Sequence, residues 1–150
     1  MSTLTNIVLR PEPSSAMAPK GLYFGIDVPF MRHIGLKPER LEPGYARTRL
    51  PLKEELLNSR GDVHGGTLMS ALDFSLSAAA RSSDPLSYGV ITIEMSTHFL
   101  GAARSDLLFE ARVIRQGSRI VFCEGTVSDN NEAIVCVARA TFKLVPLGRR

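Results

Sequence analysis

Residues 64–80 read HGGTLMSALDFSLSAAA, and this stretch decides the fold. It is long enough for a helix of about four turns or more, and its many Ala, Leu and Met residues favour a helix. Apolar residues occupy nearly every face, so we expect a central helix and not one laid on a surface. Asp73 is the only ionisable side chain between His64 and Arg81. A lone carboxylate on such a segment needs hydrogen-bonding partners or a chemical role.

The segments before this helix predict a short helix and a strand hairpin. Residues 25–35 show apolar spacing, with Gly35 as a stop signal, which is typical of a short helix. Residues 36–42 and 45–52 are separated by a Pro-Gly pair and have the pattern of two strands joined by a turn.

The segments after the helix predict an antiparallel sheet. Alternating stretches follow as a meander over residues 88–100, 106–115, 119–128 and 133–145. In the last stretch one face is apolar and the other polar, the apolar face being formed by Ile134, Cys136, Ala138, Ala140, Phe142 and Leu144. This pattern is typical of a sheet with one packed side. The order of elements therefore predicts an α+β fold in which an antiparallel sheet wraps around the long central helix.

Length and composition indicate one domain. The 150 residues fit a domain of common size, which we expect over residues 21–150 after a flexible tail over residues 1–20. The tail contains three prolines and lacks the apolar core of a signal peptide, so we expect a cytoplasmic protein. No apolar run approaches the roughly 20 residues that cross a bilayer. Cys123 and Cys136 lie among apolar residues and are expected to be free thiols.

Charge and motif content argue against several classes of partner. The net charge is +3, and Arg149 and Arg150 supply much of the excess. The remaining basic residues are scattered and no Trp is present, so a nucleic-acid partner is not expected. The three His residues are far apart in sequence, and the chain has no Gly-rich phosphate motif. We therefore expect no metal and no cofactor.

Three elements at fixed spacing carry the most specific functional signal. Asn58, His64-Gly65-Gly66 and Asp73 are spaced by six and nine residues at the start of the apolar helix, and strands with Thr92 and a Gln-Gly-Ser-Arg turn follow. Roughly residues 25–145 thereby resemble the hotdog-fold acyl-CoA thioesterases of the phenylacetate-pathway (PaaI-like) and human thioesterase-superfamily-member type. The resemblance implies a hotdog fold, hydrolysis of an acyl-CoA thioester, and sites at a subunit interface.

The chemistry of the helix start is consistent with a site there. The backbone N–H groups of Gly65 and Gly66 have no intrahelical acceptor, and the helix dipole presents partial positive charge to a thioester carbonyl or its oxyanion. Gly65 and Asp73 are eight residues apart. That is about 12 Å along a helix, too far for both to act on one carbonyl. We therefore expect a homodimer in which Gly65 of one chain faces Asp73 of the other, alone or within a dimer of dimers.

The resemblance also implies a role for each residue. The Gly65 N–H and the Asn58 side chain polarise the thioester carbonyl, while Asp73 acts as general base on water or attacks directly, with water activation preferred. Thr92 matches a position where the human relative has a hydroxyl that helps hold the water. Ser77, one turn after Asp73, is the rival for that task. The predicted substrate contacts are His64, Gly66, Ser77 and Arg119.

Each of these residues also has an ordinary structural explanation. The Asp73 carboxylate could be capped by the hydroxyl of Ser70 or Ser77, Asn58 could cap a loop, and Thr is common in strands. Four basic residues near strand ends are candidates to meet the phosphates of coenzyme A, although solvated surface charge is the commoner role. They are Arg104, Arg115, Arg119 and Lys143.

Two other functions stay open. His98-Phe99-Leu100-Gly101 partly matches the His-Phe-Pro-Gly string of hotdog dehydratases, which favours a 3-hydroxyacyl thioester dehydratase or hydratase. The string lacks the Pro, however, and follows the central helix where that family's string precedes it. A non-catalytic acyl-CoA binding module is the second alternative, since a fold does not fix a function. Aryl, short aliphatic and medium-chain acyl groups all fit the sequence.

Overall fold

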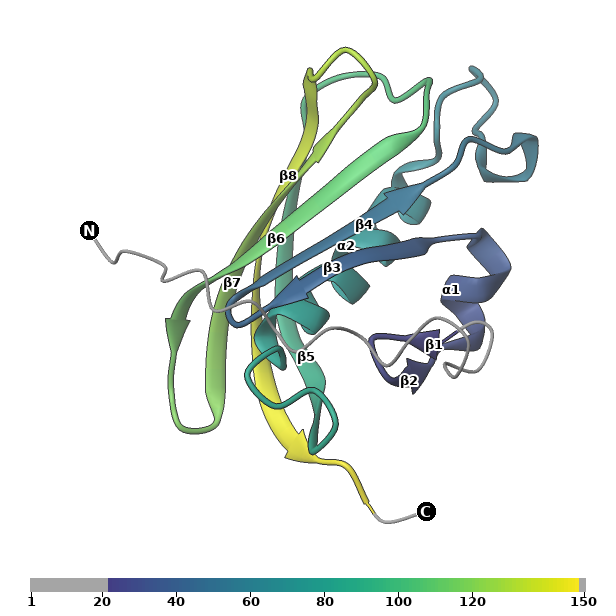
Figure 1. Cartoon of the computed structure of the whole chain (residues 1–150). Helices are drawn as coiled ribbons and strands as arrows, with labels where there is room; N and C mark the ends of the chain where they lie inside the picture. The colour runs from purple at the N-terminus through teal and green to yellow at the C-terminus, as the bar shows by residue number, and fades with distance from the viewer. Residues whose placement is uncertain (1–21, 149–150) are drawn as a thin grey trace.

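The computed structural model describes residues 22–148, in which a curved antiparallel sheet wraps around one side of a long helix (Figure 1). This helix, α2 (Gly65–Ala80), begins and ends where the sequence predicts and contacts all six strands of the sheet. The predicted α+β architecture is therefore confirmed. The predicted tail over residues 1–20 lies outside the described residues. Within residues 22–148 no helix is long and apolar enough to span a membrane.

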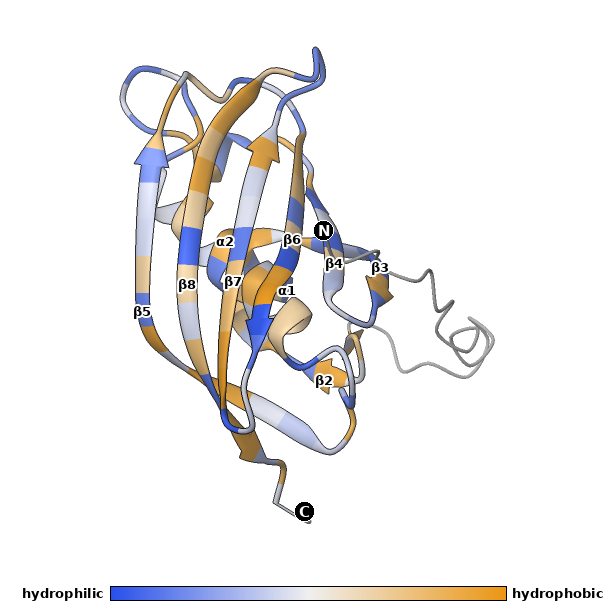
Figure 2. Ribbon diagram, turned by 90° about the vertical axis from the view of Figure 1, so that its left-hand side faces the viewer, coloured by the Kyte–Doolittle hydropathy of each residue, from blue (hydrophilic) through white to orange (hydrophobic). Residues whose placement is uncertain are grey.

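The strands lie in the order β3-β4-β6-β7-β8-β5, and each neighbouring pair is antiparallel. Figure 2 shows β5 and β3 at the opposite edges of the sheet. The bounds are β3 (Lys37–Glu42), β4 (Tyr45–Leu50), β5 (Tyr88–Phe99), β6 (Leu107–Gln116), β7 (Ile120–Ser128) and β8 (Ile134–Pro146).

The prediction of one four-strand meander is correct for β6, β7 and β8 but wrong for β5, which pairs with β8. The free side of β6 is taken by β4, where Ala46 and Thr48 are fully buried opposite Ala111 and Phe109. The expected apolar face of β8 is also confirmed except at Ile134, which is 46% exposed at the start of the strand. As a consequence β5 is a long edge strand with no neighbouring strand on its outer side among residues 22–148.

Helix α2 packs one broad face on the sheet. Leu72 and Leu76 are fully buried, and Gly125 of β7 gives them room, because a Cβ at Gly125 would lie 3.1 Å from the Leu76 side chain. The expectation that the central helix is buried on nearly every face is wrong along one stripe, since the sheet reaches around only part of the helix. This uncovered stripe recurs at helical spacing and consists of Gly66, Met69, Asp73 and Ser77.

Two hydroxyls and two thiols are buried between the helix and the sheet, and the two hydroxyls form a hydrogen bond. The hydroxyls of Thr48 on β4 and Ser75 on α2 are 2.8 Å apart, and both side chains are fully buried. Cys123 and Cys136 lie on the neighbouring strands β7 and β8 as buried free thiols, as predicted. Burial raises the pKa of Cys123 to about 12 and that of Cys136 to about 11.

The N-terminal part of the described chain covers the second half of α2. A small hairpin of β1 (Leu22–Tyr23) and β2 (Ile26–Asp27) leads into α1 (Pro29–Ile34), the predicted short helix. α1 ends at Gly35, whose φ of 79° lies in the left-handed region that glycine adopts readily.

Two kinds of contact fix this hairpin to the helix. The ring of Phe74 on α2 packs against Tyr23 and Phe24, with centroid distances of 5.4 and 6.2 Å. The guanidinium of Arg81, at the end of α2, donates to the carbonyl oxygens of Tyr23, Phe24 and Pro85. Burial lowers the pKa of Arg81 to about 10. The hairpin therefore forms a wall beside the C-terminal half of α2.

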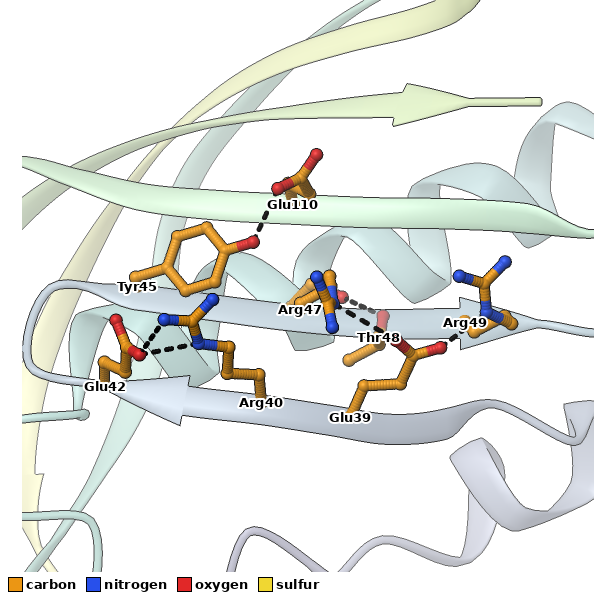
Figure 3. Close-up of polar contacts among 9 residues, drawn as sticks. Glu39, Arg40, Glu42, Tyr45, Arg47, Thr48, Arg49 and Glu110 are labelled. Carbon is orange, nitrogen blue, oxygen red and sulfur yellow. Dashed lines mark hydrogen bonds and ion pairs between the residues drawn. The ribbon is translucent and has the colours of Figure 1, made fainter. Parts of the chain in front are cut away.

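The outer face of β3, β4 and β6 is charged and carries ion pairs (Figure 3). Glu39 lies between Arg47 and Arg49, with N···O distances of 3.1 and 2.5 Å. Tyr45 donates to Glu110 at 2.5 Å, and burial together with this bond raises the pKa of Tyr45 to about 12. A 3-10 helix, η1 (Glu54–Leu56), then leads from β4 toward α2.

Candidate active site

Asp73 lies near the middle of α2 on the uncovered stripe and meets Thr92 of the edge strand β5. The Thr92 hydroxyl donates to Asp73 Oδ1 at 2.7 Å. The two residues are 19 positions apart in the sequence, and the packing of α2 against β5 brings them together. Asp73 Oδ2 accepts no hydrogen bond from residues 22–148 and stays available to a water molecule or substrate.

Ser77 has a different orientation from Thr92. Its hydroxyl donates to the backbone carbonyl of Asp73 at 2.6 Å, a common bond for a helical serine. It does not meet the carboxylate. The Ser70 hydroxyl donates to the Gly66 carbonyl, so of the three hydroxyls that the sequence offers near Asp73 only that of Thr92 donates to the carboxylate.

The start of α2 leaves one backbone N–H open. His64 is the N-cap, and its Nδ1 accepts the N–H of Gly66 at 2.9 Å, which requires an unprotonated Nδ1. The N–H of Thr67 donates to the His64 carbonyl at 2.9 Å. The N–H of Gly65 meets no acceptor in the described part of the chain. This free donor lies at the positive end of the helix dipole, where an anion is stabilised.

Asn58 lies in the loop that leads into α2, and its side chain has a structural task. Its Oδ1 accepts the backbone N–H groups of Arg60 at 2.9 Å and Asp62 at 3.1 Å. The loop-cap explanation of Asn58 is thus correct. Because the oxygen is occupied in this way, the amide Nδ2 is left as a donor without an acceptor among residues 22–148.

Two hollows lie beside the uncovered stripe. Asp73 borders one of them, and the first turn of α2 borders the other. A hollow of about 510 Å³ includes Asp73 and Ser77. A second hollow of about 530 Å³ includes His64 and Gly66 from the first turn of α2. Phe30 and Ser70 contribute to both. Within one chain, Asp73 and the helix start therefore belong to neighbouring but different hollows, consistent with their spacing along the helix.

The hollow beside Asp73 is mainly apolar. Asp73, Ser70, Ser77 and Arg81 supply its polar groups, and the rest of the lining comes from the N-terminal segment, α2, β5 and the end of β8. The apolar side chains are Ile26, Val28, Phe30, Met31, Phe74, Val90, Val145 and Leu147.

Several residues that the sequence marks line neither hollow: Asn58, Gly65, Thr92, His98 and Arg119. Arg119 is exposed in the turn between β6 and β7, and it lines neither hollow. His98 lies on β5 six residues beyond Thr92, which is about 20 Å along an extended strand. His98 and Asp73 therefore do not converge within one chain.

One ion pair next to the Asn58 loop was not predicted. Arg104 Nε donates to Asp62 Oδ1 at 2.5 Å, and Arg60 lies 3.6 Å from the other oxygen of the same carboxylate. Arg104 holds the pKa of Asp62 below its ordinary value. The sequence marks Arg104 only as one of four basic candidates to meet the phosphates of coenzyme A, with no link to Asp62. A pair separated by 42 positions has no periodic signal, and an alignment in which the two positions vary together could have found it.

The comparisons with known proteins agree on the family. Residues 60–136 match the model of the thioesterase superfamily. A Saccharolobus solfataricus protein named "Putative esterase" is 34% identical over 110 residues, covering 73% of each chain. A second protein of that name, from Halobacterium salinarum, is 33% identical over 122 residues, covering 74% of this chain and 81% of the relative.

Solved structures agree on the fold. A conserved protein of Pseudomonas aeruginosa superposes with a TM-score of 0.75 at 28% identity, covering 81% of this chain and 97% of that one. The E. coli PaaI protein from the phenylacetic acid degradation operon superposes with a TM-score of 0.72 at 18% identity, covering 81% and 86%. The predicted hotdog fold is thereby confirmed. The chain belongs to the thioesterase superfamily, as a hotdog-fold hydrolase.

Proposed function

We propose that the protein hydrolyses an acyl-CoA thioester to a free acid and coenzyme A, in sites shared between two chains. The observation that carries this proposal is the hydrogen bond from Thr92 to Asp73, which lines a mainly apolar hollow, combined with the free Gly65 N–H at the start of α2. A carboxylate held by a hydroxyl suits a general base, and a free N–H at a helix start suits an oxyanion.

The second chain is needed because Gly65 and Asp73 lie about 12 Å apart on one straight helix. Two copies of α2 that run in opposite directions about a twofold axis would set Gly65 of each chain opposite Asp73 of the other. Two equal sites would result. The dimer of dimers that the sequence also predicts would leave this arrangement unchanged.

The edge strand β5 offers the surface for such pairing. It is 12 residues long and exposes apolar side chains, with Ile91 at 55%, Ile93 at 56% and Phe99 at 51% exposure. A long apolar edge strand in water is an association surface. Antiparallel pairing of two copies of β5 would continue the sheet across the twofold axis and place the two α2 helices side by side.

The proposed reaction follows from these positions. Asp73 of one chain accepts a proton from a water molecule as that water attacks the thioester carbon, and the Thr92 hydroxyl keeps the carboxylate in place. The oxyanion receives hydrogen bonds from the Gly65 N–H and the Asn58 Nδ2 of the other chain. The tetrahedral intermediate then collapses, the C–S bond breaks, and the coenzyme A thiolate takes up the proton. Direct attack by Asp73 is the alternative route to the same products.

The acyl group would occupy the hollow beside Asp73. Its volume of about 510 Å³ and its apolar walls suit a hydrocarbon or aryl group rather than a charged one. His64 and Gly66 border the other hollow, where the pantetheine arm would enter. Arg119 stays a predicted contact for the phosphates, and the cytoplasmic location stays a prediction.

The experiment is a measurement of free thiol released from acetyl, hexanoyl, decanoyl, phenylacetyl and benzoyl coenzyme A. We expect turnover of at least one of them, and Asp73→Asn should lower kcat by about 100- to 10,000-fold while the dimer persists in gel filtration. Binding of acyl-CoA without turnover, or formation of an enoyl product from a 3-hydroxyacyl thioester instead, would overturn the proposal.

A further inference from the structure

The loop that carries Asn58 is closed on itself by four hydrogen bonds, one of which runs from the Gly61 N–H to the Asn58 carbonyl at 3.0 Å. Asn58 Oδ1 accepts the N–H groups of Arg60 and Asp62, and the Asn58 N–H donates to the Asp62 carbonyl at 2.7 Å. Gly61 turns the chain with a φ of 81°. The direction in which Asn58 presents its Nδ2 is therefore coupled to the position of Asp62.

Asp62 in turn is attached to a distant segment. Its carboxylate, 12% exposed, accepts a bond of 2.5 Å from Arg104 in the connection between β5 and β6. The adjacent residue Val63 donates to the carbonyl of Ala103 at 2.7 Å. One side-chain bond and one backbone bond thus hold the end of the Asn58 loop just before α2 begins. Ala103 is only 1% exposed, so the attachment point is part of the core.

The charge of Asp62 matters because of its position. It precedes the N-cap His64 by two residues, so an ionised carboxylate lies close to the end of α2 that would receive an oxyanion. Negative charge there would repel the oxyanion. Arg104 offsets that charge through direct contact, and the more exposed Arg60 adds a second positive group at 3.6 Å.

We propose that Asp62 and Arg104 are positioning residues, whose ion pair holds the Asn58 loop in place and neutralises the carboxylate beside the oxyanion site. This inference rests on the proposed function of Asn58 and Gly65. It assigns Arg104 a role in turnover rather than in binding coenzyme A phosphates. The two roles differ in kinetics, since a positioning residue acts on kcat and a phosphate contact acts on KM.

The test compares four variants: Arg104→Gln, Arg104→Lys, Asp62→Asn and the double variant Asp62→Asn/Arg104→Gln. We expect Arg104→Gln to lower kcat by about tenfold, the size of one charge-assisted hydrogen bond, with KM for acyl-CoA changed less than about threefold. Arg104→Lys should keep most of the activity because it keeps the charge. The double variant should exceed Arg104→Gln in kcat, because no unpaired carboxylate remains.

The matched control is Arg139→Gln on the outer face of the sheet. Arg139 is 76% exposed, similar to the 67% of Arg104, and it forms a looser pair with Glu124 at 3.6 Å, so this substitution removes a similarly exposed arginine away from the loop. We expect kcat within about twofold of wild type, since exposed pairs contribute little.

A truncated substrate, the same acyl group on N-acetylcysteamine, separates the two roles because it has no phosphates. The kcat loss of Arg104→Gln should be the same on both substrates. A rise in KM confined to acyl-CoA with unchanged kcat would overturn the positioning role, and so would an effect no larger than that of Arg139→Gln.

Amide hydrogen exchange gives a readout that does not depend on activity. The N–H groups of Arg60, Asp62 and Val63 should exchange faster in Arg104→Gln than in wild type, and unchanged exchange would contradict the inference. If wild type cleaves no thioester at all, the proposed function fails on its own, while the exchange data still decide whether Arg104 holds the loop.

Discussion

The replacement Thr92→Val removes the one hydroxyl within the described residues that donates to the Asp73 carboxylate, and it keeps the β-branched shape that suits a strand. A hydrogen bond to an ionised group contributes about 1.5–3 kcal/mol, or about ten- to a hundredfold in rate. The pair is solvent-exposed in the single chain, which places the loss near the lower end, at about tenfold in kcat. Thiol release from the best acyl-CoA under saturating conditions measures this loss.

The matched control is Ser77→Ala. The Ser77 hydroxyl donates to the backbone carbonyl of Asp73 and not to its carboxylate, so we expect kcat within about threefold of wild type. A double-mutant cycle adds the specific test. In the background of Asp73→Asn, Thr92→Val should lower kcat by less than about twofold, because the hydroxyl acts through the Asp73 carboxylate. Equal kcat for Thr92→Val and wild type, or a larger loss from Ser77→Ala, would refute the reasoning.

Three further predictions concern the rest of the fold. Ser75→Ala leaves the fully buried Thr48 hydroxyl without its partner and should lower the free energy of unfolding in urea by about 1–3 kcal/mol. The double variant Thr48→Val/Ser75→Ala should recover most of this loss. If it recovers none, the two hydroxyls are not paired. Cys123 and Cys136, with pKa values raised to about 12 and about 11, should react with Ellman's reagent at about pH 8 only after unfolding, and rapid native labelling would exclude the described burial. Arg104 lowers the folded-state pKa of Asp62, so this carboxylate stabilises the fold above its unfolded pKa of 3.8, and the contribution disappears as pH falls through the depressed value. The difference in unfolding free energy between wild type and Asp62→Asn should therefore be full near neutral pH and shrink below about pH 4. A difference that stays constant with pH would count against the ion pair.

Local signals predicted most of the fold. α2 was predictable in both length and centrality because its helix formers, its glycines at the start and its apolar content all act within the segment itself. The strand boundaries followed from alternation in the same way. The position of β5 could not be predicted, because strand alternation reports which face is buried but not which strand lies alongside. The burial of Ala46 and Thr48 against β6 decides that order, and only the assembled sheet contains this information.

The candidate site likewise contains residues that local sequence spacing predicted and contacts that only long-range packing creates. Asn58, His64 and Asp73 have a fixed spacing that could be recognised in the sequence, and the structure brings Thr92 to Asp73 through the packing of α2 on β5. The Asp62–Arg104 pair connects two loops that have no shared sequence pattern, so only the folded chain reveals it. The choice between Thr92 and Ser77 also depended on side-chain orientation, which residue spacing on a helix does not determine.

The central claim is that each active site combines Asp73 of one chain with Asn58 and Gly65 of another. Mixing two inactive variants, Asp73→Asn and Asn58→Ala, after unfolding and joint refolding tests it directly. Half of randomly assembled dimers would be mixed, and each of these would contain one intact site of two, so activity should return to about one quarter of wild type. Refolding each variant alone should give no activity. If the jointly refolded sample is as inactive as the separate variants while mixed dimers are present, each site lies within one chain and the shared-site account is wrong.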